Sequence, residues 1–275
     1  MVLPVHDLNP VRRTPLVTYA LIAINVVVFL LSPVAATITG SDGPAAQCAQ
    51  LAYLDHYAAK PSELTTNQPD DVVATGRAGQ DAQGQTGCFA GPPPYQMPPV
   101  LSVLTAMFVH GGWAHLLGNM LFLYVFGNNI EDRLGRLRFL LFYLGCGYFA
   151  TYGFALADAS STTPLVGASG AIAGVLGGYL VLYPRARVWS LLTFFFFLPV
   201  RLPAWLVLGS WFVLQYLYFR GAGISADGGG VAYLAHVLGF VLGALLVLPL
   251  RGSGADRRIA EPRFGPYSRP GDPRR

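Results

Sequence analysis

Charged residues are scarce in this 275-residue chain, at 12% of all residues, whereas soluble domains carry about 25%. There are only three cysteines, and the 32 glycines follow no triplet period, so neither a disulfide scaffold nor a collagen-like chain is indicated. Apolar residues make up 53% of the chain and the mean hydropathy is +0.46. This composition excludes disorder for most of the chain, because disordered chains are polar and highly charged. The sequence therefore predicts a membrane protein with several spans.

Long intervals without Asp, Glu, Lys or Arg locate the spans, because a helix that crosses the hydrocarbon needs about 20 mostly apolar residues. We predict an all-α, six-transmembrane-helix bundle with helices near 16–38, 113–130, 138–157, 166–183, 203–220 and 231–250. The first run is longer than the usual core of a signal peptide, so we interpret it as a retained helix. The apolar segment 188–200 is too short to span, and we predict an interfacial or re-entrant piece there.

The predicted domain organisation follows from these spans. The membrane domain covers 16–250, with an extracytoplasmic loop at 40–98, an N-terminal segment at 1–15 and a basic, disordered tail at 251–275. With a cytoplasmic N-terminus, 15 of the 18 basic residues fall on the cytoplasmic side, as the positive-inside rule requires. We therefore predict cytoplasmic termini. Two cysteines in the outer loop, at 48 and 88, fit a bacterial plasma membrane, and an organelle membrane is the alternative. The net charge of +4 follows from this topology, so the bilayer is the expected partner and no nucleic acid is needed.

The loop at 40–98 contains Cys48 and Cys88. Outside the membrane these two residues are candidates for a disulfide, and two free thiols are the alternative. A zinc site that adds His56 is less well supported, because the spacing matches no compact ligand motif. We expect neither a metal nor a cofactor.

Polar side chains occur at similar depths in three of the predicted helices, where they are costly and mark function by default. They are His115 and Asn119 in the second helix, Ser169 in the fourth and His236 in the sixth. The topology makes all three helices run from outside to inside, and each of these side chains follows soon after its helix begins. Their depths then agree within about one helical turn, so they form one layer near the outer surface.

The chemistry of these groups is complementary. A serine becomes a nucleophile when a base accepts its proton, and His236 is the natural base for Ser169. The predicted spans contain no interior Asp or Glu, so the residues indicate a Ser–His dyad. His115 and Asn119, together with the Ser169 backbone N–H, are suitable donors for a developing oxyanion. Of the remaining polar residues, we interpret Gln215 as a packing hydrogen bond and His110 as an interfacial anchor.

Small residues recur at helical spacing on the fourth and sixth helices. They are Gly170, Gly174 and Gly178, and Ala235, Gly239 and Gly243. Such faces let membrane helices approach closely. If these two faces meet, Ser169 and His236 come within hydrogen-bonding distance.

Three segments together resemble the rhomboid family of intramembrane serine proteases. They are His-Leu-Leu-Gly-Asn at 115–119, Gly-Ala-Ser-Gly at 167–170, and Ala-His-Val-Leu-Gly at 235–239 followed by Gly243. The resemblance covers about 100–250 and the first helix. It implies a six-helix fold with Ser169 as nucleophile, His236 as general base, and His115 and Asn119 as oxyanion donors, with Gly167 beside the serine. It also implies cleavage of transmembrane protein substrates near the outer leaflet without a metal or cofactor.

The chain departs from the family pattern in two places. Many members have a Trp-Arg pair in the first outer loop, whereas this loop contains no tryptophan. The position four after the serine, often an aromatic that packs on the catalytic histidine, is Ala173. The imidazole of His236 must then be held by another group.

Two other classes of function compete with a serine endopeptidase. A non-catalytic rhomboid-like protein that binds membrane clients would use the same fold but would not need Ser169 and His236. A transporter would have inverted repeats and a polar site at the midplane, whereas here the polar layer lies near one face and no internal repeat is evident.

Overall fold

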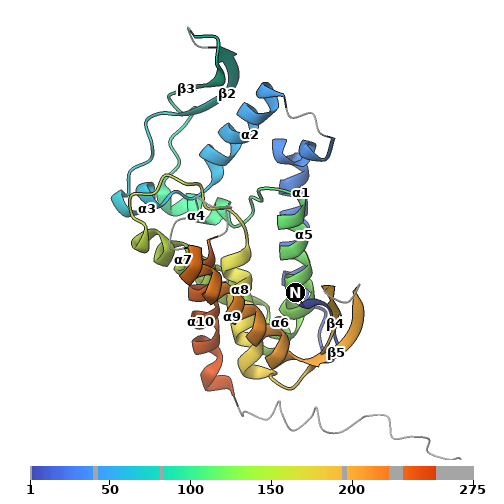
Figure 1. The fold of residues 1–275 in the computed structure, drawn as a ribbon. Coiled ribbons are helices and arrows are strands. Elements are labelled where there is room, and N and C mark those ends of the chain that lie inside the picture. The colour runs from blue at the N-terminus through green and yellow to red at the C-terminus, as the bar shows by residue number, and fades with distance from the viewer. Residues whose placement is uncertain (1, 40–42, 81–82, 194–196, 223–231, 252–275) are drawn as a thin grey trace, which may run out of the picture.

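The computed structural model describes residues 2–39, 43–80, 83–193, 197–222 and 232–251, and the chain is mostly helical (Figure 1). The helices are α1 (Leu16–Leu31), α2 (Pro44–Tyr57), α3 (Pro61–Thr66), α4 (Pro99–Ala106), α5 (Trp113–Phe122), α6 (Asn128–Leu134), α7 (Arg136–Ala157), α8 (Ser169–Leu182), α9 (Ala204–Ala222) and α10 (Tyr233–Val247). Shorter helical segments are η1 (Pro33–Thr39), η2 (Leu123–Gly127) and η5 (Leu248–Leu250). The strands are β1 (Val2–Asp7), β2 (Val73–Gln80), β3 (Thr86–Gly91), β4 (Arg187–Leu192) and β5 (Leu198–Pro203).

Each predicted interval contains a helix, although several boundaries differ. The predicted helix at 16–38 is interrupted, because α1 ends at Leu31 and Pro33 begins η1; a proline cannot continue the preceding helix. The second helix is longer than predicted, since α5, η2 and α6 follow one another without a break from Trp113 to Leu134. Among the described residues, 136–157 and 233–250 are long and apolar enough to cross a membrane, and α1 and α8 are shorter apolar helices.

Helix α8 occupies the centre of the helical part. Nearly all of its side chains from Ala171 to Leu182 are buried, and it packs against α7 and α10. A helix that is apolar and buried on all sides belongs in a core. Its Tyr179 packs on Phe126 of η2 with ring centroids 4.9 Å apart. Because α8 begins with Ser169, this placement brings the predicted nucleophile into the middle of the bundle.

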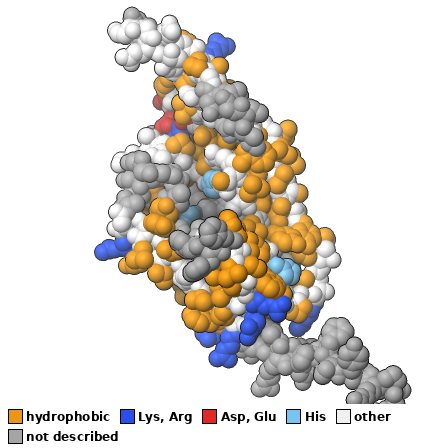
Figure 2. Space-filling view, turned by 45° about the vertical axis from the view of Figure 1, so that its right-hand side comes forward, with side chains coloured by type: hydrophobic (Ala, Val, Ile, Leu, Met, Phe, Trp, Pro, Cys, Tyr) orange, Lys and Arg blue, Asp and Glu red, His pale blue; other side chains and the backbone are white. Residues whose placement is uncertain are grey.

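The surface of the helical part is strongly apolar. Figure 2 shows hydrophobic side chains over the middle of one face and Lys and Arg gathered toward its lower end. Large exposed apolar side chains include Leu31 on α1, Leu156 on α7 and Leu217 on α9, with exposed fractions of 82%, 75% and 57%. An apolar surface of this extent needs a cover, and lipid tails are the cover that the composition indicates.

The segment 188–200 was predicted as an interfacial or re-entrant piece that does not span, and its described residues form strands. It belongs to β4 and β5, which pair with each other and, through β4, with β1 in the order β1-β4-β5. The prolines Pro4, Pro199 and Pro203 all lie on the two outer strands, where a missing N–H is tolerated. Residues 194–196 lie outside the described part. The N-terminal segment 1–15 contributes β1, so the fold is mostly helical rather than all-α.

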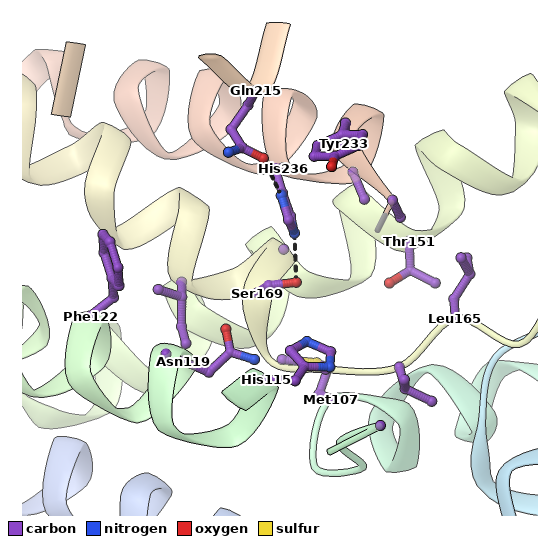
Figure 3. A pocket seen from close by; sticks show the side chains of 18 of the residues that line it. Met107, His115, Asn119, Phe122, Thr151, Leu165, Ser169, Gln215, Tyr233 and His236 are labelled. Atoms are coloured by element: carbon purple, nitrogen blue, oxygen red, sulfur yellow. Dashed lines mark hydrogen bonds between the residues drawn. The ribbon is translucent and has the colours of Figure 1, made fainter. Parts of the chain in front are cut away.

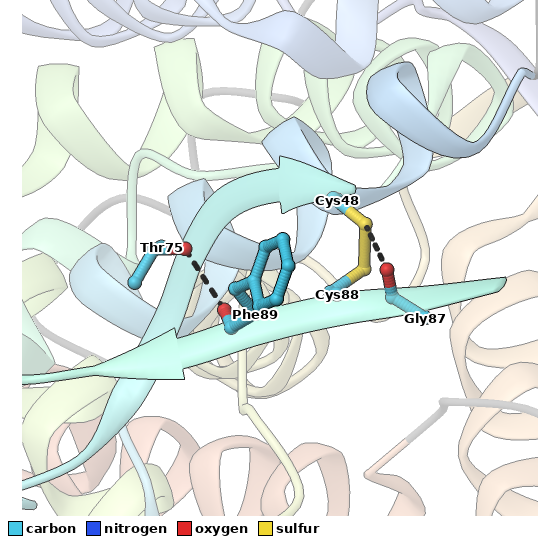
Figure 4. The surroundings of a disulfide bond; sticks show 5 residues. All are labelled: Cys48, Thr75, Gly87, Cys88 and Phe89. Carbon is cyan, nitrogen blue, oxygen red and sulfur yellow. Dashed lines mark hydrogen bonds between the residues drawn. A yellow bond between two sulfur atoms is a disulfide. The ribbon is translucent and has the colours of Figure 1, made fainter. Parts of the chain in front are cut away.

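The loop at 40–98 contains more structure than the sequence indicated. Helix α2 and the hairpin β2–β3 rise above the helical part, whereas α3 packs against α7 and α4 (Figure 1). A disulfide joins Cys48 of α2 to Cys88 of β3 (Figure 4), so the pairing that the sequence left open is present. The Thr75 hydroxyl of β2 donates a hydrogen bond to the Phe89 carbonyl of β3 at 2.9 Å, which links the two strands of the hairpin. The third cysteine, Cys146, is buried in α7.

Polar groups hold the opposite end of the bundle together. The carboxylate of Glu131 accepts hydrogen bonds from the backbone N–H of Val17 and of Thr18, at 3.0 and 2.7 Å. It thereby caps the start of α1 from another helix, since the first N–H groups of a helix lack partners within it. The carboxylate of Asp7 accepts bonds from Asn129 and Tyr179, both at 2.6 Å. These contacts attach β1 and α1 to the central helices. Residues 252–275 of the predicted disordered tail lie outside the described residues.

Candidate active site

Ser169 is the first residue of α8, and a tight turn delivers the chain to it. Gly167 has φ +111°, a conformation that residues with a side chain rarely adopt. A β-carbon at this position would also lie 2.6 Å from Nε2 of His115. Gly167 is therefore required both for the turn and for the approach of α5. The N-terminus of α8 presents backbone N–H groups without helical partners beside the serine.

Ser169 and His236 are in contact. The distance from Oγ of Ser169 to Nε2 of His236 is 2.8 Å (Figure 3). His236 lies in the first turn of α10, whereas Ser169 begins α8. The contact thus joins two helices whose residues are 67 positions apart.

The close approach of α8 and α10 makes this contact geometrically available. A β-carbon on Gly239 would collide with the Gly170 carbonyl, and one on Gly243 would collide with the Gly174 carbonyl. The third close approach involves Gly177, whose added β-carbon would collide with the Phe240 carbonyl. The sequence indicated Gly178 instead, but a β-carbon there would meet side chains at 3.3–3.4 Å. The three contacting positions on α8 are therefore Gly170, Gly174 and Gly177. They follow the spacing i, i+4 and i+7, which places them on one face of the helix.

A carboxamide occupies the other side of the imidazole. Oε1 of Gln215, on α9, lies 2.8 Å from Nδ1 of His236, and Figure 3 shows Gln215, His236 and Ser169 in one row. The sequence indicated a packing hydrogen bond for Gln215, and its contact with the catalytic candidate His236 was not predicted. A signal was present, because Gln215 is the sole Asn, Gln, Asp or Glu within 204–222.

Aromatic rings surround the same imidazole. The Trp211 ring of α9 lies 5.9 Å from that of His236 at an interplanar angle of 32°, and the Tyr233 ring lies 6.5 Å away at 90°. Position 173, where many relatives have an aromatic, is a buried alanine. The ring contacts therefore come from α9 and from α10 itself.

His115 and Asn119 lie on α5 across from the serine and line the same cavity. Asn119 is 8% exposed, and within the described part of the chain its Nδ2 has no hydrogen-bond partner. A buried amide donor without a partner is costly, so this N–H group is available to an oxygen that enters the cavity. All four predicted polar residues thus surround one space (Figure 3).

His110 is not the interfacial anchor that the sequence indicated. It is 1% exposed, and its ring centroid lies 5.1 Å from that of His115. Its position behind His115 makes it part of the wall that supports the α5 side of the site.

The cavity has a volume of about 680 Å³, within the range of small-molecule and peptide sites. Its polar part contains Ser169, His236, His115 and Asn119, and its walls are otherwise mostly apolar. Apolar lining residues include Phe122, Ile172, Leu176 and Trp211. Among the described residues there is no cluster of three or more His, Cys, Asp or Glu side chains that could hold a metal ion.

Comparison with known proteins agrees with this site. The Rhomboid domain model matches residues 99–253, more than half of the chain and all four polar residues of the cavity. The chain belongs to the rhomboid family. It is accordingly an integral membrane protein, since a rhomboid domain resides in the bilayer.

Individual rhomboid relatives are similar over parts of the chain. Rhomboid protein 1, mitochondrial, of Saccharomyces cerevisiae is 31% identical over 149 residues, covering 53% of this chain and 40% of the relative. The putative rhomboid protease YdcA of Bacillus subtilis is 40% identical over 82 residues, which is 28% of this chain and 39% of the relative. Rhomboid protease GluP of Bacillus subtilis is 42% identical over 81 residues, 28% of this chain and 15% of the relative. The chain thus spans about 40% or less of these relatives, and no solved structure matches it.

Proposed function

We propose that this rhomboid-family protein is an intramembrane serine endopeptidase that cleaves transmembrane segments of other membrane proteins near the outer leaflet. The observation that carries the proposal is the 2.8 Å contact between Oγ of Ser169 and Nε2 of His236 at the wall of a cavity. A serine needs such a base to become a nucleophile. Two relatives that are named as proteases, YdcA and GluP, support the same activity.

Acylation would begin with the transfer of the Ser169 hydroxyl proton to Nε2 of His236 as Oγ attacks the scissile carbonyl carbon. The carbonyl oxygen becomes an oxyanion, and donors aimed at it lower the barrier. The unpartnered Nδ2 of Asn119 and the His115 ring lie on the side of the cavity where this oxygen would form. Collapse of the intermediate breaks the C–N bond, while the imidazolium returns its proton to the leaving amine.

Deacylation would use the same groups with water in place of the amine. His236 accepts a proton from a water molecule as that oxygen attacks the acyl-enzyme. The ester bond then breaks, and the proton returns to Oγ of Ser169. The cycle needs only water and the peptide, and no group that the chain does not supply.

The length of α8 supports a shallow site. Its 14 residues span about 21 Å at a rise of about 1.5 Å per residue, whereas the hydrocarbon is about 30 Å thick. If α8 ends at the cytoplasmic boundary, near the exposed Arg185, Ser169 lies about 9 Å inside the opposite boundary. Water can reach that depth through a cavity that opens outward. A substrate helix must unwind locally there, because a hydrogen-bonded helix hides its scissile carbonyl.

The proposed topology has six spans, formed by α1, the run α5–η2–α6, α7, α8, α9 and α10. The short helix α8 fits this scheme because it is buried by its neighbours rather than by lipid. Exposed arginines at 12, 13, 136, 138, 185, 187 and 201 favour a cytoplasmic position for the end that contains β1, β4 and β5. Both chain termini would then be cytoplasmic.

The test is cleavage of a single-span model substrate by the purified protein in detergent. We expect Ser169→Ala and His236→Ala each to lower the rate by at least about 10³-fold, because the nucleophile and its base act as a unit. Ser210→Ala is the matched control, since the Ser210 hydroxyl of α9 donates a hydrogen bond to the Val207 carbonyl of its own helix, and its rate should stay within about twofold of wild type. Cleavage that survives Ser169→Ala would refute the mechanism.

A fluorophosphonate probe separates the enzyme from a non-catalytic rhomboid-like client binder. We expect covalent labelling at Ser169 in the folded wild type and none in Ser169→Ala. A folded wild type that binds a membrane substrate, leaves it intact and takes up no label would establish the non-catalytic alternative.

A further inference from the structure

We propose that Gln215 is a positioning residue that fixes the productive tautomer of His236, so that the site operates as a neutral Ser169–His236–Gln215 triad. This inference rests on the proposed function. Its direct observation is the pair of contacts on opposite ring nitrogens, each 2.8 Å long: Nε2 to Ser169 and Nδ1 to Gln215.

The tautomer follows from the chemistry of the partner. A neutral imidazole carries one N–H group, on either Nδ1 or Nε2. The oxygen of a carboxamide can only accept a hydrogen bond, so Oε1 of Gln215 selects the form with the proton on Nδ1 of His236. The lone pair is then on Nε2 and faces the Ser169 hydroxyl. The other tautomer would place N–H against the serine and could not accept its proton.

The site has no competing charged partner for this imidazole. The titratable groups that line the cavity with His236 are His115 on α5, Tyr218 on α9 and Tyr233 on α10, and the described lining contains no Asp, Glu, Lys or Arg. In serine proteases with a charged triad a carboxylate performs the orienting role. A neutral amide orients the ring without bringing an unpaired charge into the membrane, which is costly.

One face of α9 supplies both contacts that hold the ring. Trp211 and Gln215 are four residues apart and therefore lie on the same side of the helix. Trp211 lies beside the face of the imidazole at 5.9 Å, while Gln215 binds its edge. Phe240 of α10 stacks on Phe212 and Trp211, at centroid distances of 4.5 and 6.1 Å, and so keeps α9 against α10. Helix α9 thereby holds the imidazole by both its face and its edge.

Two substitutions separate an orienting role from a packing role. Gln215→Met keeps the length of the side chain but replaces the amide oxygen with a thioether, which is only a weak hydrogen-bond acceptor for the Nδ1 N–H. We expect kcat to fall about 10- to 100-fold with KM within about twofold of wild type. Gln215→Glu keeps an acceptor oxygen and should retain kcat within about tenfold at alkaline pH. Its carboxylate stabilises the imidazolium, so the acidic limb of the pH–rate profile should move to higher pH. A packing role would leave that limb in place.

The experiment uses the full chain in detergent, with kcat and KM for a single-span model substrate from pH 5 to 9 and the rate of fluorophosphonate labelling. Leu214→Met is the matched control, because Leu214 is adjacent on α9, 38% exposed and not part of the cavity wall, and it should behave as wild type. Thermal unfolding of each variant tests whether the protein is folded. An unchanged kcat in folded Gln215→Met, or an unmoved acidic limb in Gln215→Glu, would overturn the role of Gln215 alone. A wild type that neither cleaves nor takes up label would overturn the proposed function instead.

Discussion

Two kinds of contact hold this protein together, and they occur in different places. Between α8 and α10 the helices meet backbone to backbone, with Gly239 against the Gly170 carbonyl and Gly243 against the Gly174 carbonyl. At the two ends of the bundle, by contrast, the fold depends on buried charges. Lys60 is 2% exposed and faces three carboxylates, Asp55, Glu63 and Asp70.

The difference reflects the solvent around each region. Lipid gives no hydrophobic drive for helix association, so helices inside a bilayer associate through close packing. The ion pairs of Lys60 with three carboxylates and the hydrogen bonds that Asp7 accepts from Asn129 and Tyr179 attach chain segments that have little apolar surface. The backbone-to-backbone packing of α8 and α10 leaves no room for an added side chain, whereas polar contacts can exchange partners or protons. Substitutions in the two regions should therefore fail in different ways.

The largest effect is expected from Gly243→Val. Its side chain would collide with the backbone of Gly174, and neither helix can move without separating Ser169 from His236. We expect a loss of more than about 5 kcal/mol in the free energy of unfolding, seen as the absence of a thermal transition in detergent and of Ser169 labelling. Gly145→Val on α7 is the control, because Gly145 is exposed and a β-carbon there would meet nothing within 4 Å. A folded, labelled Gly243→Val protein would show that the close approach is dispensable.

A smaller effect is expected from Lys60→Met, just before α3. Burial lowers the pKa of Lys60, but the hydrogen bonds that its ammonium donates to Asp55 and Asp70 outweigh burial and raise this pKa, so the ammonium is the charge that holds the cluster together. Without it three carboxylates repel one another, and we expect a loss of about 3 kcal/mol in the free energy of unfolding. Arg77→Met, on an exposed position of β2, should change this free energy by less than about 0.5 kcal/mol.

The Lys60 cluster lies next to the approach to the nucleophile. Ala59 exchanges backbone hydrogen bonds of 3.0 and 2.8 Å with Leu165, and Leu165 lines the cavity. We therefore expect Lys60→Met also to lower the rate of Ser169 labelling, whereas Arg77→Met leaves it unchanged. Equal unfolding curves for Lys60→Met and wild type would show that the buried charge contributes nothing to the free energy of unfolding.

The smallest effect is expected from Asp7→Asn at the end of β1. Burial raises the pKa of Asp7 from 3.8 to about 6, so the folded protein binds this proton more tightly than the unfolded chain does. Its contribution to stability is fully present below about pH 4 and is lost as the pH rises through 6. At about 1.4 kcal/mol per pKa unit, Asp7→Asn should reduce the decline in unfolding free energy between pH 4 and 7 by about 2 kcal/mol.

Chemical denaturation at several pH values measures this difference, with Asp132→Asn as the control. Asp132 accepts a hydrogen bond from the Arg13 N–H near the surface, so this variant controls for the loss of a hydrogen-bonded carboxylate elsewhere in the protein. An identical pH dependence for Asp7→Asn and wild type would mean that the Asp7 carboxyl is not protonated preferentially in the fold.

Much of the candidate site could be predicted from the sequence because it depends on local spacing within apolar helices. His115 and Asn119 share a face by their separation of four, and the glycine spacing indicated which faces of α8 and α10 would meet. The contact of Gln215 with His236 could not be predicted, since it depends on how α9 is rotated against α10, which Phe212, Trp211 and Phe240 decide. The sheet β1-β4-β5 was missed for a similar reason, because β1 pairs with residues about 185 positions later in the chain.

The sequence by itself determined that the chain is apolar, where its long apolar helices begin and which polar groups interrupt them, because these properties depend on composition and on the period of a helix. Only the tertiary structure decided which acceptor faces Nδ1 of His236, which glycine meets Phe240, and that the N-terminal residues form a strand. Those outcomes depend on the rotation and crossing of separate elements, and the packing of the whole molecule sets both.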